Sequence, residues 1–301
     1  MKDFNDKVAV ITGAASGFGR EFARIGAELG MRLVLADVQR ERLDEVLMEL
    51  KQRGAQAIAM HVDVSKGEQV EALAAATMDA FGAVNLVFNN AGVAGVGGLV
   101  WENSVRDWEW MLGVNLWGVI HGVRVFTPLM LAAATASPDY RGHIVNTASM
   151  AGLINASPTA AYNVSKHAVV SLSESLYQDL DLTTTQIHCS VLCPYFVPTG
   201  INQWDLNRPA DMVNDAPLTK SQRIARAMAE KAITSGKVSA EQVARMTFDA
   251  IRGDSFYIFS HPHALGGVRQ RMEAILALRN PADPFAERPD LRARLEAALR
   301  E

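Results

Sequence analysis

Three polar side chains have the types and spacing needed to move a proton to or from an alcohol oxygen. Tyr162 and Lys166 stand four residues apart, so a helix would place them on one face. A free phenol has a pKa of roughly 10, and an adjacent cation favours its ionised form. Ser149, upstream of both, could donate a hydrogen bond to a substrate oxygen. Because hydride transfer to a carbonyl leaves an alkoxide that needs a proton and a polar clamp, this set predicts such a reaction.

Each of these residues also has an ordinary structural interpretation. A Tyr and a Lys at this spacing can be a surface pair on a helix, and Ser149 can cap the end of a strand. Asn115, within another predicted helix, can be a polar residue that its neighbours satisfy. The functional interpretation is favoured because all of them occur in order, downstream of a turn that suits a nucleotide.

The turn that suits a nucleotide follows the first apolar run. It reads Thr12-Gly13-Ala14-Ala15-Ser16-Gly17-Phe18-Gly19 and leads into a segment of helical period. Its glycines allow a tight turn and bring backbone N–H groups close to a pyrophosphate, while the helix N-terminus adds partial positive charge. The sequence therefore predicts a dinucleotide site with Gly13, Ser16, Gly17, Phe18 and Gly19 at its turn.

Two acidic residues stand where the next strands end. Asp37 can accept hydrogen bonds from the adenosine ribose and would repel a 2′-phosphate, which favours NAD over NADP. The alternative is that Asp37 caps the turn before Gln39. Asp63, with Val64 after it, could contact the adenine edge, although capping of the next helix explains this aspartate equally well.

These residues need a scaffold, and short apolar runs alternate with longer helical segments along the chain. The runs of strand length are 8–12, 32–36, 57–62, 86–89, 143–147, 187–192 and 256–259. The segments of helical period are 19–29, 40–52, 66–81, 104–130, 160–180 and 240–252. The alternation predicts an α/β fold, a doubly wound (Rossmann) parallel sheet of about seven strands with helices on both faces. We expect one domain over 1–260, including a substrate loop at 195–237, and an extension over 261–301 that packs on this domain or on a neighbouring subunit.

The glycine spacing, Thr-Gly-x-x-x-Gly-x-Gly, resembles that of the short-chain dehydrogenase/reductase family, and further motifs follow in the family's order over residues 5–200. Asn89-Asn90-Ala91-Gly92 is similar to the motif after the fourth strand, so Asn90, Ala91 and Gly92 are expected at the cofactor. Tyr162-Asn163-Val164-Ser165-Lys166 has the family's Tyr-x-x-x-Lys spacing. The resemblance implies that Tyr162 and Lys166 also contact the cofactor, Lys166 at the nicotinamide ribose, and that Asn115 holds a water in the proton relay.

The segment after the sixth predicted strand is similar to the family's nicotinamide segment, with Pro194, Val197 and Thr199 at matching places. The family usually has Gly where this chain has Tyr195, so the backbone there cannot use positive φ freely. A Gly-rich wall at 92–98, with Leu99 and Trp101, could face an apolar lid formed by Tyr195, Phe196, Ile201, Trp204, Leu206, Met212 and Val213. Such walls suggest a hydrophobic substrate that is aromatic, alicyclic or steroid-like.

The composition argues against several other classes of protein. The formal net charge of −4 gives no basic surface for nucleic acid or for an anionic membrane. The two cysteines, Cys189 and Cys193, lack the partners of a zinc site, so no metal is expected. The first residues carry no apolar signal core, and the most apolar stretch, 111–130, contains Asn115, His121 and Arg124. We therefore expect a cytoplasmic protein that does not bind a membrane.

Two competing functions stay open. An NADP-dependent ketone or 3-oxoacyl reductase would favour basic residues after the second strand, where Arg40 and Arg42 lie. A catalytically silent dinucleotide sensor would have no use for the Ser, Tyr and Lys set. The expected partner is a small alcohol or ketone. Members of the family pair through two long helices, here 104–130 and 160–180, and this implies a homodimer or homotetramer.

Overall fold

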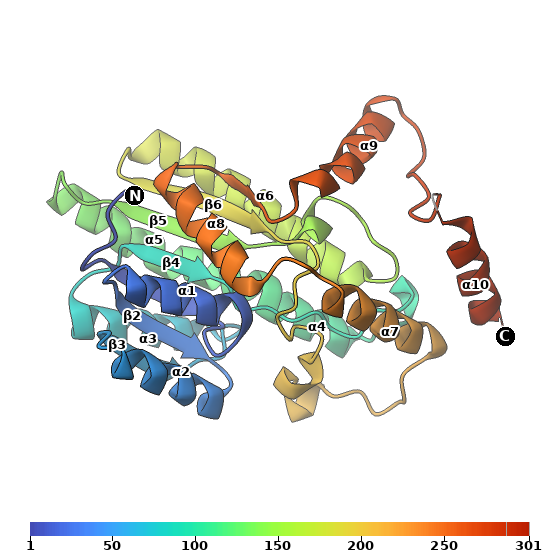
Figure 1. The fold of residues 1–301 in the computed structure, drawn as a ribbon, viewed down its shortest axis with the longest axis horizontal. Coiled ribbons are helices and arrows are strands. Elements are labelled where there is room, and N and C mark those ends of the chain that lie inside the picture. The colour runs from blue at the N-terminus through green and yellow to red at the C-terminus, as the bar shows by residue number, and fades with distance from the viewer. Residues whose placement is uncertain (287, 301) are drawn as a thin grey trace.

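A computed structural model describes residues 1–286 and 288–300 of the chain. Its core is one parallel sheet of seven strands in the order β3-β2-β1-β4-β5-β6-β7, with helices on both faces (Figure 1). The predicted doubly wound α/β fold is thereby confirmed. The strands are β1 (Val8–Thr12), β2 (Arg32–Asp37), β3 (Ala57–His61), β4 (Leu86–Asn89), β5 (Gly142–Thr147), β6 (Ile187–Cys193) and β7 (Tyr257–Phe259).

The strands form where the sequence has short, uninterrupted apolar runs. Every residue of β1, β4 and β5 is buried, as expected of strands that are covered on both faces. Parallel pairing places Thr12 beside Ala36 and Asn89 beside Asn146, so the carboxyl ends of the strands meet at one edge. The strand order reverses at β1, and ligands of such sheets bind in the crevice at that point.

Two groups of helices cover the two faces of the sheet. One core cluster joins the sheet to α1 (Gly17–Glu28), α2 (Arg40–Gln52) and α8 (Ala240–Arg252), and the other joins it to α3 (Gly67–Phe81), α5 (Gly118–Ala136) and α6 (Ala160–Thr183). In the first cluster, Phe22 of α1 stacks on Phe88 of β4 with ring centroids 4.3 Å apart, and Phe248 of α8 lies 5.7 Å from Phe88. This packing holds the glycine turn, which begins α1, against the end of β1.

The single helix predicted over 104–130 is interrupted in the structure. α4 (Val105–Leu112) is followed by one π-helical turn, Gly113–Trp117, and then by α5. π turns are rare and are often found at functional sites. The spacing of apolar residues in the sequence did not indicate this π turn. α4, the π turn and α5 follow one another without a gap, so the sequence pattern resembles that of one helix. Asn115 lies in the π turn and is fully buried.

The chain after β6 contains more helix than the sequence pattern indicated. Two 3₁₀ turns, Trp204–Asn207 and Ala210–Met212, precede α7 (Lys220–Thr234) within the substrate loop. Within the predicted extension 261–301, of which residues 287 and 301 lie outside the described residues, α9 (Leu265–Leu276) packs Leu265 and Val268 against the core. α10 (Pro289–Arg300) ends an arm that extends away from the sheet (Figure 1).

One helical stretch, Val105–Ala136, is long and apolar enough to cross a membrane by length and composition, with a mean hydropathy of 1.4 in its most apolar window. Its α5 part nevertheless belongs to the core, where Phe126 and Met130 are fully buried. Only 28% of that window is buried inside the protein. The stretch therefore lies on the sheet, and its exposed large apolar side chains are those of Val105 and Trp117.

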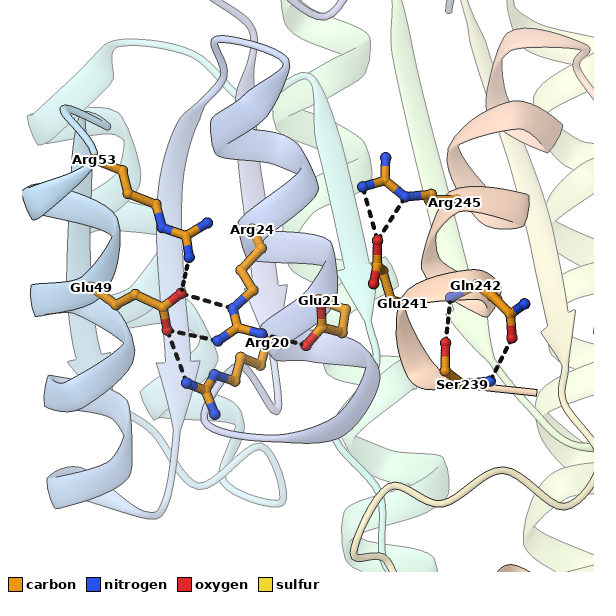
Figure 2. A network of polar contacts seen from close by, with 9 residues as sticks. All are labelled: Arg20, Glu21, Arg24, Glu49, Arg53, Ser239, Glu241, Gln242 and Arg245. Atoms are coloured by element: carbon orange, nitrogen blue, oxygen red, sulfur yellow. Dashed lines mark hydrogen bonds and ion pairs between the residues drawn. The ribbon is translucent and has the colours of Figure 1, made fainter. Parts of the chain in front are cut away.

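The charged surface of the first helical group is a network rather than a basic patch. Glu49 of α2 accepts hydrogen bonds from Arg20 and Arg24 of α1, and Arg53 pairs with the same carboxylate (Figure 2). These guanidinium groups hold the pKa of Glu49 at about 2. The arginines of α1 are already paired with carboxylates. They therefore do not form a free cationic cluster that could bind an anionic ligand.

Candidate active site

The turn after β1 has the backbone conformation that glycine permits. Gly13 and Gly17 have φ values of 67° and 51°, in the left-handed region. A Cβ atom at Gly13 would stand 2.9 Å from Ala91 Cα, and one at Gly19 would stand 2.0 Å from the Gly13 carbonyl oxygen. Ser16 precedes α1 without a side-chain cap to it, so the N–H groups of the first helical turn can bind an anion. The turn therefore fits the pyrophosphate of a dinucleotide.

Thr12 and Asn90 join the ends of β1, β4 and β5. Thr12 Oγ1 accepts the N–H groups of Asn90 and Ala91, at 2.9 and 3.1 Å, and donates to the Phe88 carbonyl at 3.1 Å. The Asn90 side chain donates to the Thr12 carbonyl at 2.9 Å and accepts from the Thr147 hydroxyl at 3.2 Å. The loop after β4 is thus held beside the glycine turn.

Asp37 and Asp63 both line the same cavity as the glycine turn. Asp37 Oδ2 accepts the Ala15 N–H and Oδ1 accepts the Gln39 N–H, each at 2.9 Å. Burial raises the pKa of Asp37, and these N–H groups oppose the rise. Because each carboxylate oxygen accepts more than one hydrogen bond, ribose hydroxyls can still bind there. Asp63 Oδ1 accepts the Ser65 N–H at 2.9 Å, so part of this side chain supports the turn before α3.

Ser149, Tyr162 and Lys166 meet at the carboxyl ends of β5 and β6. Lys166 Nζ donates to the Thr147 carbonyl at 2.8 Å and lies 5.7 Å from the centroid of the Tyr162 ring. The Ser149 hydroxyl accepts the Ala151 N–H at 3.1 Å and donates to the Pro194 carbonyl at 3.4 Å. The Ser149 hydroxyl thus caps the 3₁₀ turn Met150–Gly152 that follows β5, and Ser149 also lines the cavity.

Burial shifts the acid–base pair toward its uncharged forms. It raises the pKa of Tyr162, while the Ser149 hydroxyl opposes the rise. It lowers the pKa of Lys166 to about 8. Burial alone therefore works against the phenolate, so a nearby positive charge such as protonated Lys166 is needed to ionise Tyr162.

The side chain of Asn115 is satisfied by the protein itself. Its Oδ1 accepts the Val93 N–H at 2.8 Å, and its Nδ2 donates to the Val93 carbonyl at 2.9 Å and to Ser165 Oγ at 3.1 Å. The side chain therefore braces the loop after β4 against α6, as the structural interpretation expected. The water-holding role that the family resemblance implies stays a prediction.

A cavity of about 1280 Å³ joins the glycine turn to the Ser, Tyr and Lys set. It exceeds the roughly 300–1,000 Å³ of a pocket for one small molecule, so a dinucleotide and a substrate fit together. Gly19 and Asn115 lie behind the cavity wall. The other predicted site residues line it, namely Gly13, Ser16, Gly17, Phe18, Asp37, Asp63, Val64, Asn90, Ala91, Gly92, Ser149, Tyr162, Lys166, Pro194, Val197 and Thr199.

The far end of the cavity is apolar and is closed by the substrate loop. Of the predicted lid, the residues that line it are Tyr195, Phe196, Ile201, Trp204, Leu206 and Met212, whereas Val213 does not. On the opposite wall Gly92–Gly97 line the cavity, but Leu99 and Trp101 do not, and Trp101 is 77% exposed. Tyr195 replaces the usual glycine without a positive φ, and its N–H donates to Ser260 Oγ at 3.0 Å.

Three features of the site were missed by sequence reasoning. Trp110 of α4 lines the cavity, and the Arg208 guanidinium lies 5.2 Å from its ring centroid. Gln39, beside the cofactor end, donates to Asn207 Oδ1 in the substrate loop at 2.5 Å. α7 adds Ala225, Met228, Ala229 and Ile233 to the lining. No local signal could reveal these contacts, because each joins segments that are far apart in sequence.

The fold, the glycine turn and the Ser, Tyr and Lys set together define a dinucleotide-dependent oxidoreductase. The family model for short chain dehydrogenase matches residues 7–208, and the chain belongs to this family.

Similar proteins agree with this assignment over most of their length. The CLA biosynthesis dehydrogenase/reductase of Lactiplantibacillus plantarum is 33% identical over 92% of this chain and 95% of its own. The 1-deoxy-11-beta-hydroxypentalenate dehydrogenase of Streptomyces exfoliatus is 34% identical over 89% of this chain and 88% of its own. A short chain dehydrogenase/reductase from Burkholderia phymatum, solved in complex with NAD, superposes with a TM-score of 0.92 at 51% identity, covering 95% of this chain and 100% of that one.

Proposed function

We propose that this protein is an NAD-dependent dehydrogenase that interconverts a hydrophobic secondary alcohol and its ketone. The observation that carries the proposal is that Ser149, Tyr162 and Lys166 line the same cavity as the glycine turn. A dinucleotide bound along that cavity supplies the hydride acceptor or donor. A relative named as a 1-deoxy-11-beta-hydroxypentalenate dehydrogenase supports a hydroxyl-bearing substrate.

The residues divide the proton chemistry among them. The Ser149 hydroxyl donates a hydrogen bond to the substrate oxygen and holds it beside Tyr162. In oxidation, the Tyr162 phenolate takes the hydroxyl proton as the hydride leaves carbon, and in reduction the phenol returns it. Protonated Lys166 stabilises the phenolate by charge. General acid–base catalysis of this kind contributes roughly 10²–10⁴-fold to the rate.

NAD rather than NADP is the proposed cofactor. Asp37 lies at the end of β2 and lines the cavity, where its charge would oppose a 2′-phosphate. Arg42 lines the cavity too, so the basic residue that NADP would need is present nearby. Asp37 and Arg42 have opposite effects on the binding of a 2′-phosphate. The cofactor preference is therefore to be measured directly and not inferred from the family.

The substrate end favours a bulky apolar molecule. Trp110 and Trp204 lie with ring centroids 6.1 Å apart, and both line the cavity. Aromatic walls of this kind suit a ring system or a long hydrocarbon. The preference for NAD, together with these walls, favours oxidation of an alicyclic, aromatic or steroid-like alcohol.

Apolar side chains exposed on Val105–Ala136 and on α6 support a homo-oligomer. Trp117 is 51% exposed, and Val164 and Leu182 of α6 are 48% and 84% exposed. Exposed large apolar side chains that gather on one surface can mark a subunit interface. We propose that two copies pair through α5 and α6.

The proposed function is tested by turnover of a panel of secondary alcohols with NAD and with NADP, followed at the NADH absorbance. We expect turnover with NAD, highest for cyclic and aryl alcohols. Turnover with NADP alone, in the direction of ketone reduction, would favour the reductase instead. NADH binding by fluorescence with no turnover of any alcohol or ketone in the panel would favour the dinucleotide sensor.

A further inference from the structure

The substrate side of the cavity is covered by α7, whose position depends on how its first turn is attached. α7 contributes Ala225, Met228, Ala229 and Ile233 to the cavity lining. It begins after Thr219, whose side chain caps the helix together with Gln222 in a capping box. The contacts at this end of α7 therefore decide whether the cavity is closed over a substrate.

A single carboxylate, that of Glu102, holds the start of α7. Glu102 Oε2 accepts the Thr219 hydroxyl at 2.7 Å and the Ser221 hydroxyl as well. Ser221 Oγ in turn accepts the Leu99 N–H at 3.0 Å, and Gln222 Nε2 donates to the Glu102 carbonyl at 3.4 Å. The hydroxyl bonds also lower the pKa of Glu102, so the carboxylate is ionised at neutral pH.

The backbone beside Glu102 is shaped to let α7 approach. Gly97 and Gly98 have φ values of 72° and 93°, in the region that favours glycine. A Cβ at Gly98 would stand 2.6 Å from Gln222 Cγ, and one at Gly97 would stand 2.8 Å from Ala225 Cβ. The loop after β4 can therefore approach α7 this closely because glycine stands at these two positions.

A second acid, Asp107 of α4, anchors the preceding part of the substrate loop. Asp107 Oδ1 pairs with Arg208 Nη1 at 2.7 Å, with both side chains about 95% buried (5% and 4% exposed). Asn214 Nδ2 also donates to Asp107, at 3.0 and 3.1 Å to its two oxygens. Separating a buried charge pair leaves both charges unpaired, which is far more costly than exchanging hydroxyl bonds with water. The Asp107 end of the loop is thus fixed, and the Glu102 end can release.

We propose that Glu102 is a positioning residue for the substrate, which latches α7 over the cavity while the buried Asp107–Arg208 pair keeps the loop before it in place. When the Glu102 contacts are made, Ala225, Met228 and Ile233 of α7 complete the cavity wall. Release of the latch lets α7 move away from the Gly-rich wall and opens a route for the alcohol. The substrate part of this inference rests on the proposed function, whereas the latch itself does not.

The test is limited trypsin digestion of the full-length Glu102→Gln protein, with cleavage sites assigned by mass spectrometry. Trypsin can cut α7 after Lys220, Arg223, Arg226 and Lys231. Because digestion of an open state tracks its population, we expect these cuts to become about tenfold faster than in wild type. Cuts in α1 and α2 keep their wild-type rate. Asp79→Asn, a change of an exposed acid on α3, is the matched control and leaves all rates unchanged.

The kinetic arm distinguishes positioning from general instability. In Glu102→Gln the KM for the best alcohol of the panel rises at least about threefold, because less of the protein is in the closed, binding-competent form. The kcat changes less than the KM, and the dissociation constant for NADH stays at its wild-type value. Ser221→Ala, which removes one donor and keeps the carboxylate, shifts digestion and KM in the same direction by a smaller factor, and it carries the test if Glu102→Gln does not fold.

The proposal is overturned if cleavage in α7 is no faster than in wild type, or if cleavage accelerates equally in α1 and α2. It is also overturned if the KM for the alcohol and the NADH dissociation constant rise together. If wild type turns over nothing but α7 is cleaved faster in the variant, the latch stands and the proposed function fails.

Discussion

Burial shifts the pKa values of both Tyr162 and Lys166 toward the uncharged forms. The pKa of Lys166 falls to about 8, and that of Tyr162 rises, because the same apolar surroundings disfavour both charges. A nearby positive charge or a hydrogen bond from a bound hydroxyl would oppose the effect of burial on Tyr162 and favour its phenolate. The four-residue spacing places Lys166 on the same face of α6 as Tyr162. The Thr147 carbonyl accepts a hydrogen bond from Lys166 Nζ at 2.8 Å and holds the amine in this place.

Asp37 carries the cofactor preference at this scale. In Asp37→Asn the negative charge that opposes a 2′-phosphate is lost, so the ratio of kcat/KM with NAD to kcat/KM with NADP falls at least about tenfold. A charge pair separated by about 4 Å interacts by ~1–4 kcal/mol between water and a protein surface, which is enough for this change. Asp37→Asn also alters the hydrogen bonds that Asp37 accepts from Ala15 and Gln39. Because the ratio compares two cofactors in the same variant, a general loss of activity from this cause cancels.

Asp63→Asn is the matched control for the cofactor ratio. Asp63 lines the same cavity near the adenine end and would meet a part that NAD and NADP share. Its ratio should stay at the wild-type value. An unchanged ratio in Asp37→Asn, or an equal change in both variants, would contradict the assignment of NAD preference to Asp37.

Among the elements, β5 contains a buried histidine that makes the fold sensitive to acid. His143 is fully buried, and its Nε2 lies 2.7 Å from Ser190 Oγ of β6. Burial lowers its pKa to about 3. The unfolded chain takes up the proton near pH 6.5, so below that pH the unfolded state binds more protons and the folded state loses stability. The stabilising effect of the neutral imidazole is complete above pH 6.5 and declines as the pH falls toward 3.

The free energy of unfolding should fall by about 2 kcal/mol between pH 7 and pH 5 on account of His143 alone. Urea denaturation at the two pH values measures it. In His143→Gln, which can still bond to Ser190, this part of the pH dependence is lost. His263→Gln, a change of an exposed histidine, keeps it. Equal pH dependence in wild type and His143→Gln would show that the buried imidazole is not responsible.

Local patterns predicted most elements because their apolar period is a property of neighbouring residues. The runs 8–12 and 86–89 match β1 and β4 exactly in their bounds, and 40–52 and 240–252 match α2 and α8. α7 was not among the predicted helices, although Thr219 and Gln222 form a capping box whose spacing is a local sequence signal. The π turn at Gly113–Trp117 was invisible because its residues have no distinctive local pattern.

The candidate site follows the same rule. Residues that motifs mark, such as Ser149 and Tyr162, could be named from sequence, and the structure places them on one cavity. Trp110, Arg208 and Glu102 act through partners from other segments, so a single sequence carries no sign of their importance. For Asn115 only part of the role could be predicted. Its motif could be recognised in the sequence, but the hydrogen bonds of its side chain to Val93 could not.

The whole molecule presents an apolar face that a second copy would cover. Val164 is 48% exposed and lies on α6 between the two proton-transfer residues, on the opposite side of the helix. Wild type should have an apparent mass of at least twice the 32.7 kDa of one chain by size exclusion with light scattering. Val164→Arg, which places a charge in the proposed interface, should shift the mass toward that of one chain.

Met48→Arg is the control for the oligomer, because Met48 is 57% exposed on α2, away from α5 and α6. It should leave the mass at the wild-type value. A wild-type mass of one chain, or dissociation by both substitutions alike, would contradict pairing through α5 and α6. The arm that α9 and α10 form would then be the next surface to consider (Figure 1).

The proposed role of Tyr162 as the proton carrier in an NAD-dependent alcohol oxidation is tested by the rate of Tyr162→Phe on the best alcohol of the panel. The substitution keeps the ring and removes the hydroxyl. We expect kcat to fall by roughly 10²–10⁴-fold, while NADH binding is retained with a much smaller change in its dissociation constant. A Phe variant that retains wild-type turnover would contradict the account.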